Sequence, residues 1–453
     1  MSILAALTED VYKCNKCGFC QEVCPTYKTT GEEFSVARGR NRLVRLALEG
    51  ILDLSREREL EEYIYSCILC GSCVSVCPSA VPTDRIVAAA RAELVSRKGQ
   101  PLVKRLLLRG VVADMRRIRL TGRILAFYQR SGLRWLAKRS GLLHALGTLG
   151  KIEEIMPDLS SRSTAVAKPG FAGPGYGSAS PWARSPEDQR GKDRRKEATA
   201  HPDRVGYFIG CAAQAVYRTV PEAVREVLAW NGTQTVTVDN VCCGLPHQAY
   251  GDFEKARDLA RANIDLFSAT DLDIIIFDCA TCGHTLREYK NLLKDDEAYR
   301  QKAASFSAKI MDVNDYLVRH GFQKPEGEMK VRVTYHDPCH LARGMGVRSA
   351  PREVLKSIPG VDFVEMNEAD MCCGGGGSYN ITHYQGSLKI LERKMKNYQA
   401  TGAELLSTSC PGCTVQLSYG LKLNKLPGTV VHPVELLRAA YRAEKKGDNA
   451  ASD

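Results

Sequence analysis

The spacing of the cysteines constrains the fold of this chain more than any other feature of its sequence. All eighteen cysteines among its 453 residues fall into four groups. Two groups repeat the pattern C-x2-C-x2-C-x3-C-P, and two share a longer pattern that contains an adjacent cysteine pair. Regularly spaced thiolates are the ligands that iron–sulfur clusters and zinc ions take in proteins. We therefore predict a chain that folds around iron–sulfur clusters and moves electrons.

The length and the start of the chain argue against disulfides as the use of these thiols. Disulfide-rich proteins are small secreted scaffolds, whereas this chain is long enough for roughly two to four domains. Its first residues, MSILAALTED, lack the basic and apolar segments of a secretory signal. No stretch approaches the roughly 18 apolar residues of a membrane span. We expect a cytoplasmic protein with reduced cysteines, with peripheral contact on the inner face of the membrane as an open alternative.

The two short runs predict two cubane [4Fe–4S] clusters. In two-cluster ferredoxins, such a run supplies three ligands to one cluster and its fourth ligand to the other. The first predicted ligand set is Cys14, Cys17, Cys20 and Cys77, and the second is Cys67, Cys70, Cys73 and Cys24. Zinc is the rival metal, since C-x2-C pairs also form zinc ribbons.

Residues 1–100 are predicted to form an α-helical domain around these two clusters. Between the runs, residues 36–49 and 52–65 have apolar positions three and four apart, which is the period of amphipathic helices. A ferredoxin module with such a long helical insertion resembles those of succinate dehydrogenase and heterodisulfide reductase.

Residues 101–156 form a basic connector, for which we expect two or three amphipathic helices. Between residues 101 and 150, eleven Lys and Arg residues stand against one acid, Asp114, so almost all of the net charge of +11 lies here. The apolar stripe can pack on the protein, on an anionic membrane or on an acidic partner subunit, and these interpretations remain open. No nucleic-acid motif accompanies the charge, so no nucleic-acid partner is expected.

The rest of the chain divides into a linker and a duplicated pair of lobes. Residues 157–202 lose all periodicity and are rich in Pro, Gly and Ser, which predicts a flexible linker. Strand-like and helical segments then alternate twice, over 203–325 and 326–445, with cysteines after the strand-like segments. The duplication predicts two related α/β lobes that hold clusters at the carboxyl ends of their strands, in a shared cleft.

Each lobe carries one set of five cysteines. The first set is Cys211, Cys242, Cys243, Cys279 and Cys282, and the second is Cys339, Cys372, Cys373, Cys410 and Cys413. Five thiolates exceed the four that a tetrahedral zinc or a cubane takes. The pattern resembles the CCG cysteine-rich domain of the heterodisulfide reductase type. That resemblance implies a non-cubane [4Fe–4S] cluster in each lobe, with zinc or an ordinary cluster as the alternative for one of them.

Three histidines beside these cysteines are candidate catalytic proton donors. His336 and His340 flank Cys339, and His284 follows Cys282. An imidazole can donate a proton near neutral pH. Histidines at such positions also serve local structure, and both interpretations remain open.

Apart from the linker, the whole chain resembles fused ferredoxin–CCG proteins. Among them are the iron–sulfur subunits of glycolate oxidase and D-lactate dehydrogenase and a fused subunit of heterodisulfide reductase, and the segments CGFCQEVCPTY, VARGR and CATCGHTL are most similar to the glycolate and lactate branch. The resemblance implies an electron-transfer subunit that takes electrons from a separate FAD-containing 2-hydroxy-acid dehydrogenase, because no flavin fingerprint occurs in this chain. Quinone or a membrane cytochrome would accept them. The alternative is a catalytic subunit that cleaves or forms a disulfide at the CCG clusters.

Overall fold

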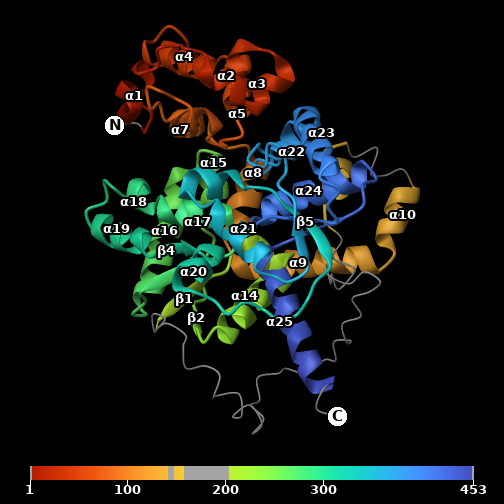
Figure 1. Ribbon diagram of the computed structural model, residues 1–453. Helices are drawn as coiled ribbons and strands as arrows, with labels where there is room; N and C mark the ends of the chain where they lie inside the picture. Colours follow the sequence, from red (N-terminus) through yellow and green to blue (C-terminus); the bar gives the residue numbers. More distant parts are fainter. Residues whose placement is uncertain (1–2, 141–146, 158–203, 451–453) are drawn as a thin grey trace.

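A helical N-terminal domain lies against two α/β lobes in the computed structural model of the protein (Figure 1). The structure describes residues 3–140, 147–157 and 204–450, so the predicted linker falls outside the described residues except for its first position. Within those ranges, no helix combines the length and the apolar character that crossing a membrane requires.

The N-terminal domain consists of short helices joined by the two cysteine runs. Its elements are η1 (Ala5–Leu7), α1 (Thr8–Tyr12), α2 (Phe19–Val23), α3 (Pro25–Thr30), η2 (Glu33–Ser35), α4 (Ala37–Leu48), α5 (Arg58–Tyr65), α6 (Ser72–Ser75) and α7 (Thr83–Lys98). The helix expected over 52–65 begins only at Arg58. The reason is local, because the Asp53 carboxylate accepts hydrogen bonds from the amide and hydroxyl of Ser55 and so forms a turn.

The connector contains more elements than the two or three helices expected. These are α8 (Leu102–Leu107), the π-helical turn η3 (Leu108–Val112), α9 (Met115–Arg130), α10 (Leu133–Arg139) and α12 (Thr148–Ile155). Asp114 begins α9 by accepting hydrogen bonds from the amides of Arg116 and Arg117. Gly132, in a left-handed conformation, separates α9 from α10. Caps and turns therefore break the connector into short helices.

Each lobe contains a four-stranded parallel sheet, and the strand order is the same in both. The order is β2-β1-β3-β4 in the first lobe and β6-β5-β7-β8 in the second. The strands are β1 (Val205–Phe208), β2 (Thr235–Thr237), β3 (Ile274–Phe277), β4 (Ile310–Asp312), β5 (Val331–Tyr335), β6 (Val361–Phe363), β7 (Leu405–Ser407) and β8 (Thr429–Val431). The predicted fold class, a helical two-run domain followed by two duplicated α/β lobes, is confirmed.

Helices surround both sheets. Those of the first lobe are α13 (Cys211–Ala215), α14 (Thr219–Trp230), α15 (Leu245–Ala249), α16 (Phe253–Ser268), α17 (Ala280–Arg287), α18 (Tyr289–Leu292), α19 (Arg300–Ala308) and α20 (Val313–His320). The second lobe has the π-helical turn η5 (His340–Met345), α21 (Ser349–Lys356), α22 (Tyr379–Thr382), α23 (Tyr384–Ala400), α24 (Pro411–Leu423) and α25 (Pro433–Ala450).

The topology places the lobe cysteines where α/β proteins bind their ligands. Strand order reverses between β1 and β3 in one sheet and between β5 and β7 in the other. The crevice outside the carboxyl ends of such strands is the usual ligand site. All ten lobe cysteines lie on segments that leave these ends.

The two lobes form one packed unit. Both large hydrophobic cores draw residues from each lobe, and the rings of Trp230 and Tyr441 stack across the junction with centroids 4.9 Å apart. The amide of Ala280 donates a 3.0 Å hydrogen bond to the carbonyl of Ser409. These two residues adjoin Cys279 and Cys410, so the lobes meet at their cysteines.

Candidate iron–sulfur sites

The second predicted ferredoxin set converges on one cavity. Cys24, Cys67, Cys70 and Cys73 all line it, although Cys24 is more than forty residues from the others in sequence. Burial and the neighbouring sulfurs raise the pKa of Cys73 well above its usual value. Metal binding at such a site therefore releases protons from the thiols.

The first predicted ferredoxin set lies nearer the surface. Cys14 and Cys77 pack against the same core, Cys14 also lies near Cys20, and Cys17 is exposed. Phe19, beside this set, is 62% exposed. The described surface therefore offers a partner an apolar contact beside these thiols.

Both runs fold into the same loop. Gly18 and Gly71 take left-handed conformations that begin α2 and α6, and Lys16 and Leu69 occupy left-handed positions two residues earlier. Left-handed non-glycine residues are uncommon and cost about 1–2 kcal/mol each. Their repetition at one position of both runs indicates that the loop conformation itself is required there.

The five cysteines of each lobe follow one another in the same spatial order. In the first lobe the thiol contacts run through Cys211, Cys242, Cys243, Cys282 and Cys279. In the second they run through Cys339, Cys372, Cys373, Cys413 and Cys410. Each predicted set is thus brought together, and the adjacent cysteine pair lies inside each series rather than at its end.

The two series also meet each other. The thiols of Cys279 and Cys410 are in contact, and the hydroxyl of Thr281 lies 3.3 Å from Cys410 Sγ. All eighteen thiols are free of disulfides. The ten lobe cysteines therefore form one unbroken line of sulfur across the junction, which chain order alone does not reveal.

The N-terminal domain contacts this line of thiols at the end of the line that lies in the second lobe. Cys70 lies near Cys372 and Cys339, and Ile68 shares a small apolar cluster with Cys372. Gly376 has no side chain to obstruct this approach: a Cβ there would come within 2.7 Å of Ile68 Cγ2. The glycines after the second CCG motif thus admit the ferredoxin loop.

The three candidate histidines occupy two different places. His336 is 1% exposed, and its ring lies within 4.8 Å of the sulfurs of Cys373 and Cys413. Burial lowers the pKa of His336 to about 3, so this ring is neutral near pH 7. The rings of His284 and His340 stack at the junction of the lobes with centroids 4.9 Å apart.

Two buried arginines, whose role was not predicted from the sequence, support the ferredoxin loops. Arg91 donates hydrogen bonds to the carbonyls of Cys67 and Ala249, at 2.6 and 2.8 Å, and so joins the N-terminal domain to the first lobe. Arg40 bonds the carbonyls of Ser35 and Tyr63. For Arg40 the available sign was its position on the buried face of the amphipathic helix α4, whereas α7 is not amphipathic and gave no such sign for Arg91.

Family models match the same regions. Residues 10–81 match the 4Fe-4S dicluster domain, residues 205–287 and 333–418 match the cysteine-rich CCG domain, and residues 99–156 match the linker region of the glycolate oxidase iron-sulfur subunit. The chain therefore carries iron–sulfur clusters, and its connector is a recognised part of that subunit type.

Relatives with the same architecture extend over nearly the whole chain. It is 32% identical to the probable glycolate oxidase iron-sulfur subunit of Bacillus subtilis (strain 168), over 95% of this chain and 94% of that protein. It is 24% identical to the glycolate oxidase iron-sulfur subunit of Escherichia coli (strain K12), over 95% and 94%. A subunit of the dihydromethanophenazine:CoB–CoM heterodisulfide reductase of Methanosarcina mazei is 26% identical, over 98% and 97%. The chain belongs to the family of the glycolate oxidase iron-sulfur subunits, the electron-transfer subunits of oxidoreductases that join a dicluster ferredoxin domain to two CCG domains.

Proposed function

We propose that this chain takes electrons from an FAD-containing dehydrogenase of a 2-hydroxy acid, such as glycolate or lactate, and delivers them to quinone. The observation that carries the proposal is the succession of neighbouring thiols that runs from Cys20 through Cys24, Cys73 and Cys70 to the junction of the lobes. Sulfur sites in such close succession suit one-electron transfer between buried clusters. The family membership and the matching connector support the same role.

The proposed ligands are the four cysteine sets. Cys14, Cys17, Cys20 and Cys77 would hold one cubane, Cys24, Cys67, Cys70 and Cys73 the other, and each five-cysteine set a non-cubane [4Fe–4S] cluster. The donor chemistry fits, because thiolate sulfur is the usual ligand of iron–sulfur clusters and backbone amides of Leu69, Val81 and Gly374 already point at cysteine sulfur, at 3.4–3.5 Å. When bound, the clusters supply one-electron redox chemistry.

The protein residues around the sets would hold and insulate these groups. The amide donors favour negative charge on sulfur, and neutral His336 excludes water beside Cys373 and Cys413. Electrons would enter at the surface of Cys17 and Phe19, where the dehydrogenase can dock, and leave from the lobes.

The connector is the proposed membrane contact. Three apolar residues on one face of α9 are 55–66% exposed, namely Leu120, Ile124 and Phe127, and the segment is strongly basic. An amphipathic surface of this kind binds anionic lipid. We place the subunit peripherally on the inner face of the membrane on these grounds.

Metal analysis after anaerobic purification tests the cofactor part. Four [4Fe–4S] clusters give about 16 iron atoms per chain, whereas about 12 with one zinc indicate zinc in one lobe. A zinc-dominated preparation would refute the redox role. Co-purification with the dehydrogenase, followed by reduction of the clusters with glycolate or lactate, tests the partner and the substrate.

A second function is favoured by one feature of the lobe junction. Cys279 and Cys410 touch beside the stacked pair His284 and His340, and Thr281 bonds both His340 and Cys410. A disulfide substrate could be reduced at such a pair of sites, as the heterodisulfide reductase relative suggests. Reduced protein that cleaves organic disulfides but does not reduce quinone would favour this function over the first.

A further inference from the structure

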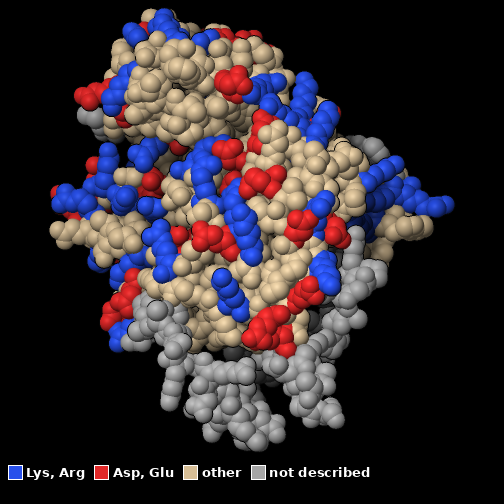
Figure 2. Space-filling view, in the orientation of Figure 1, with Lys and Arg blue, Asp and Glu red and all other residues tan. Residues whose placement is uncertain are grey.

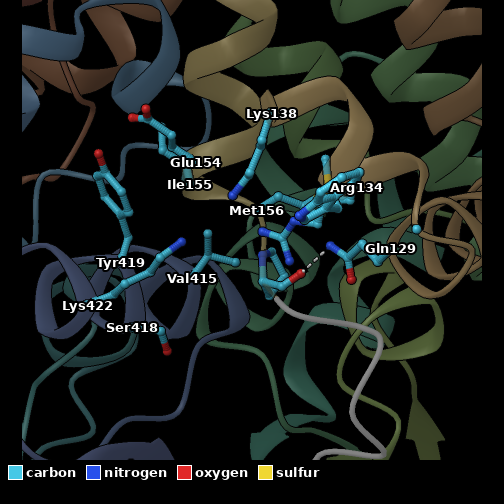
Figure 3. Close-up of a pocket in the computed structure, with 13 residues that line it drawn as sticks. Gln129, Arg134, Lys138, Glu154, Ile155, Met156, Val415, Ser418, Tyr419 and Lys422 are labelled. Atoms are coloured by element: carbon cyan, nitrogen blue, oxygen red, sulfur yellow. Dashed lines mark hydrogen bonds between the residues drawn. The ribbon is translucent and has the colours of Figure 1, made fainter. Parts of the chain in front are cut away.

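A cavity of about 540 Å³ lies between the connector and the second lobe. One wall comes from α9, α10 and the end of α12, and the opposite wall is α24 (Figure 3). The wall residues used below are Trp135, Lys138, Val415, Ser418, Tyr419 and Lys422. None of them belongs to the predicted cluster ligands.

The cavity and the second five-cysteine set lie on opposite sides of helix α24. Helix α24 starts directly after Cys410 and carries Cys413 in its first turn. Val415 packs against the core that contains both cysteines and also lines the cavity. Residues at positions 415, 418 or 419 and 422 share one helix face. Cys413 precedes Val415 by two residues and lies on the opposite face of α24, so the width of this helix separates the cavity from the predicted cluster ligand.

The cavity also presents cationic donors to its interior. The side chains of Lys138 and Lys422 point into it from opposite walls (Figure 3). Buried Glu153 pairs with both Arg134 and Lys138, at 2.5 and 3.3 Å, whereas Lys422 has no ion pair among the described residues. Lys422 is an exposed residue, and its ammonium group can donate to a ligand whose carbonyl oxygens gain negative charge on reduction.

The connector has exposed apolar side chains at and near the cavity. Trp135 lines the cavity and is 62% exposed, and its neighbours Leu133 and Leu136 are 47% and 56% exposed. Lys and Arg side chains gather over α10 at the right-hand edge of the molecule (Figure 2). A ligand with a polar head and a lipid tail would match both the cavity and its rim.

We propose that this cavity binds the head group of a lipid quinone and is the site where electrons leave the chain. The proposal rests on the proposed function. A cluster held by the second five-cysteine set would supply two electrons one at a time, solvent would supply two protons, and the two C=O groups of the quinone would become C–OH groups. The hydroxyl of Tyr419 contacts Glu154 and lies 2.6 Å from that of Tyr384, which gives the protons a polar path.

A variant that fills the cavity tests its location. The intact holoprotein is reduced with dithionite, freed of excess reductant and mixed with decylubiquinone or with ferricyanide, a small oxidant that needs no pocket. We expect Ser418→Trp to slow reoxidation by the quinone at least about tenfold and to leave reoxidation by ferricyanide unchanged. Equal quinone rates in the variant and the native protein would overturn the proposal.

A pair of charge variants provides an independent test if the bulky variant does not fold. Lys422→Gln should raise the quinone concentration for half-maximal rate by about tenfold, the usual effect of losing a charged donor. Lys425→Gln removes the same charge from an exposed position outside the cavity and should change nothing. Equal effects of both substitutions would point to general surface charge and contradict the site.

The same assay separates failure of the site from failure of the proposed function. A native protein that ferricyanide reoxidises but quinone does not would reject quinone as acceptor altogether. Fast quinone reduction that survives both Ser418→Trp and Lys422→Gln would keep the acceptor and reject this cavity.

Discussion

At the scale of single residues, the two lobes differ in the side chain that supports the loop before each cysteine pair. Asn263 on α16 donates to the Cys242 carbonyl at 3.0 Å. Lys394 on α23 donates to the carbonyls of Glu368 and Ala369, at 2.5 and 3.3 Å. Both side chains are fully buried, so the second set has a buried ammonium group where the first has a neutral amide.

Removing the charge of Lys394 should change the midpoint potential of the second-lobe cluster and leave that of the first-lobe cluster unchanged. A nearby positive charge favours the reduced, more negative state of a cluster. We expect Lys394→Met to lower the midpoint potential of the second-lobe cluster by on the order of 59 mV, which is a tenfold change in a one-electron equilibrium. Potentiometric titration followed by electron paramagnetic resonance measures it. Lys396→Met, on the same helix with a 72% exposed side chain, is the control, and equal shifts would contradict the assignment.

His432 should make the stability of the lobe junction depend on pH. The His432 ring donates from Nε2 to the Asp278 carbonyl and accepts at Nδ1 from the Val434 amide. The backbone amide of His432 donates to the Glu435 carboxylate. Burial lowers the pKa of His432 to about 4, below the ordinary value of about 6.5. As the pH falls, the unfolded chain therefore binds a proton at His432 at a higher pH than the folded chain does. The free energy of unfolding consequently decreases as the pH drops below about 6.5.

The substitution His432→Gln isolates this effect from the other buried histidines. Its amide can still donate to Asp278 but cannot titrate. Between pH 7.5 and 5.5 the native protein should lose about 1 kcal/mol more than the variant. Thermal unfolding at several pH values compares the two, and parallel pH profiles would show that His432 does not contribute.

At the scale of elements, the N-terminal domain is joined to the first lobe by a close approach of α7 to the turn after α15. Gly251 has φ +82°, and a Cβ there would lie 2.4 Å from the carbonyl oxygen of Arg91. Gly251→Ala should therefore separate the domain from the lobe, besides the cost of about 1–2 kcal/mol for a left-handed alanine. Gly232→Ala carries the same strain at φ +77°, with no atom of the described residues within 4 Å of the added Cβ.

Thermal unfolding and the rate of electron passage into the lobes distinguish these two variants. We expect Gly232→Ala to lower the thermal stability and to leave internal electron transfer unchanged. Gly251→Ala should lower the thermal stability further and also slow internal electron transfer. Equal losses in both measurements would mean that the contact between Gly251 and Arg91 does not hold the domain.

The elements themselves were largely predictable, whereas their contacts were not. Cysteine spacing and strand-like segments are local patterns, so the two runs and the duplicated lobes could be inferred from the chain. The bond from Arg91 to Ala249 and the contact of Cys279 with Cys410 join segments more than 120 residues apart. Such pairs depend on how whole elements pack, and a single sequence carries no mark of them.

At the scale of the whole molecule, the contacts give the proposed sites an order. The N-terminal domain touches the second five-cysteine set through Cys70 and Cys372, and the cavity lies across helix α24 from the same set. The first set contacts the second through the thiols of Cys279 and Cys410. Along this succession of thiols, the second set therefore lies between the ferredoxin cysteines and both possible exits.

This order predicts unequal effects from equivalent ligand substitutions. Cys339→Ala, which removes a proposed ligand of the second set, should prevent reduction of the first-lobe cluster and abolish reoxidation by quinone. Cys211→Ala, the equivalent change in the first set, should leave the second-lobe cluster reducible and quinone-reactive. Freeze-quenched samples, reduced through the dehydrogenase partner and examined by electron paramagnetic resonance, report each cluster separately. If Cys211→Ala instead blocked quinone while Cys339→Ala did not, electrons would leave through the first lobe, and the disulfide-reducing function at the junction would become the better account.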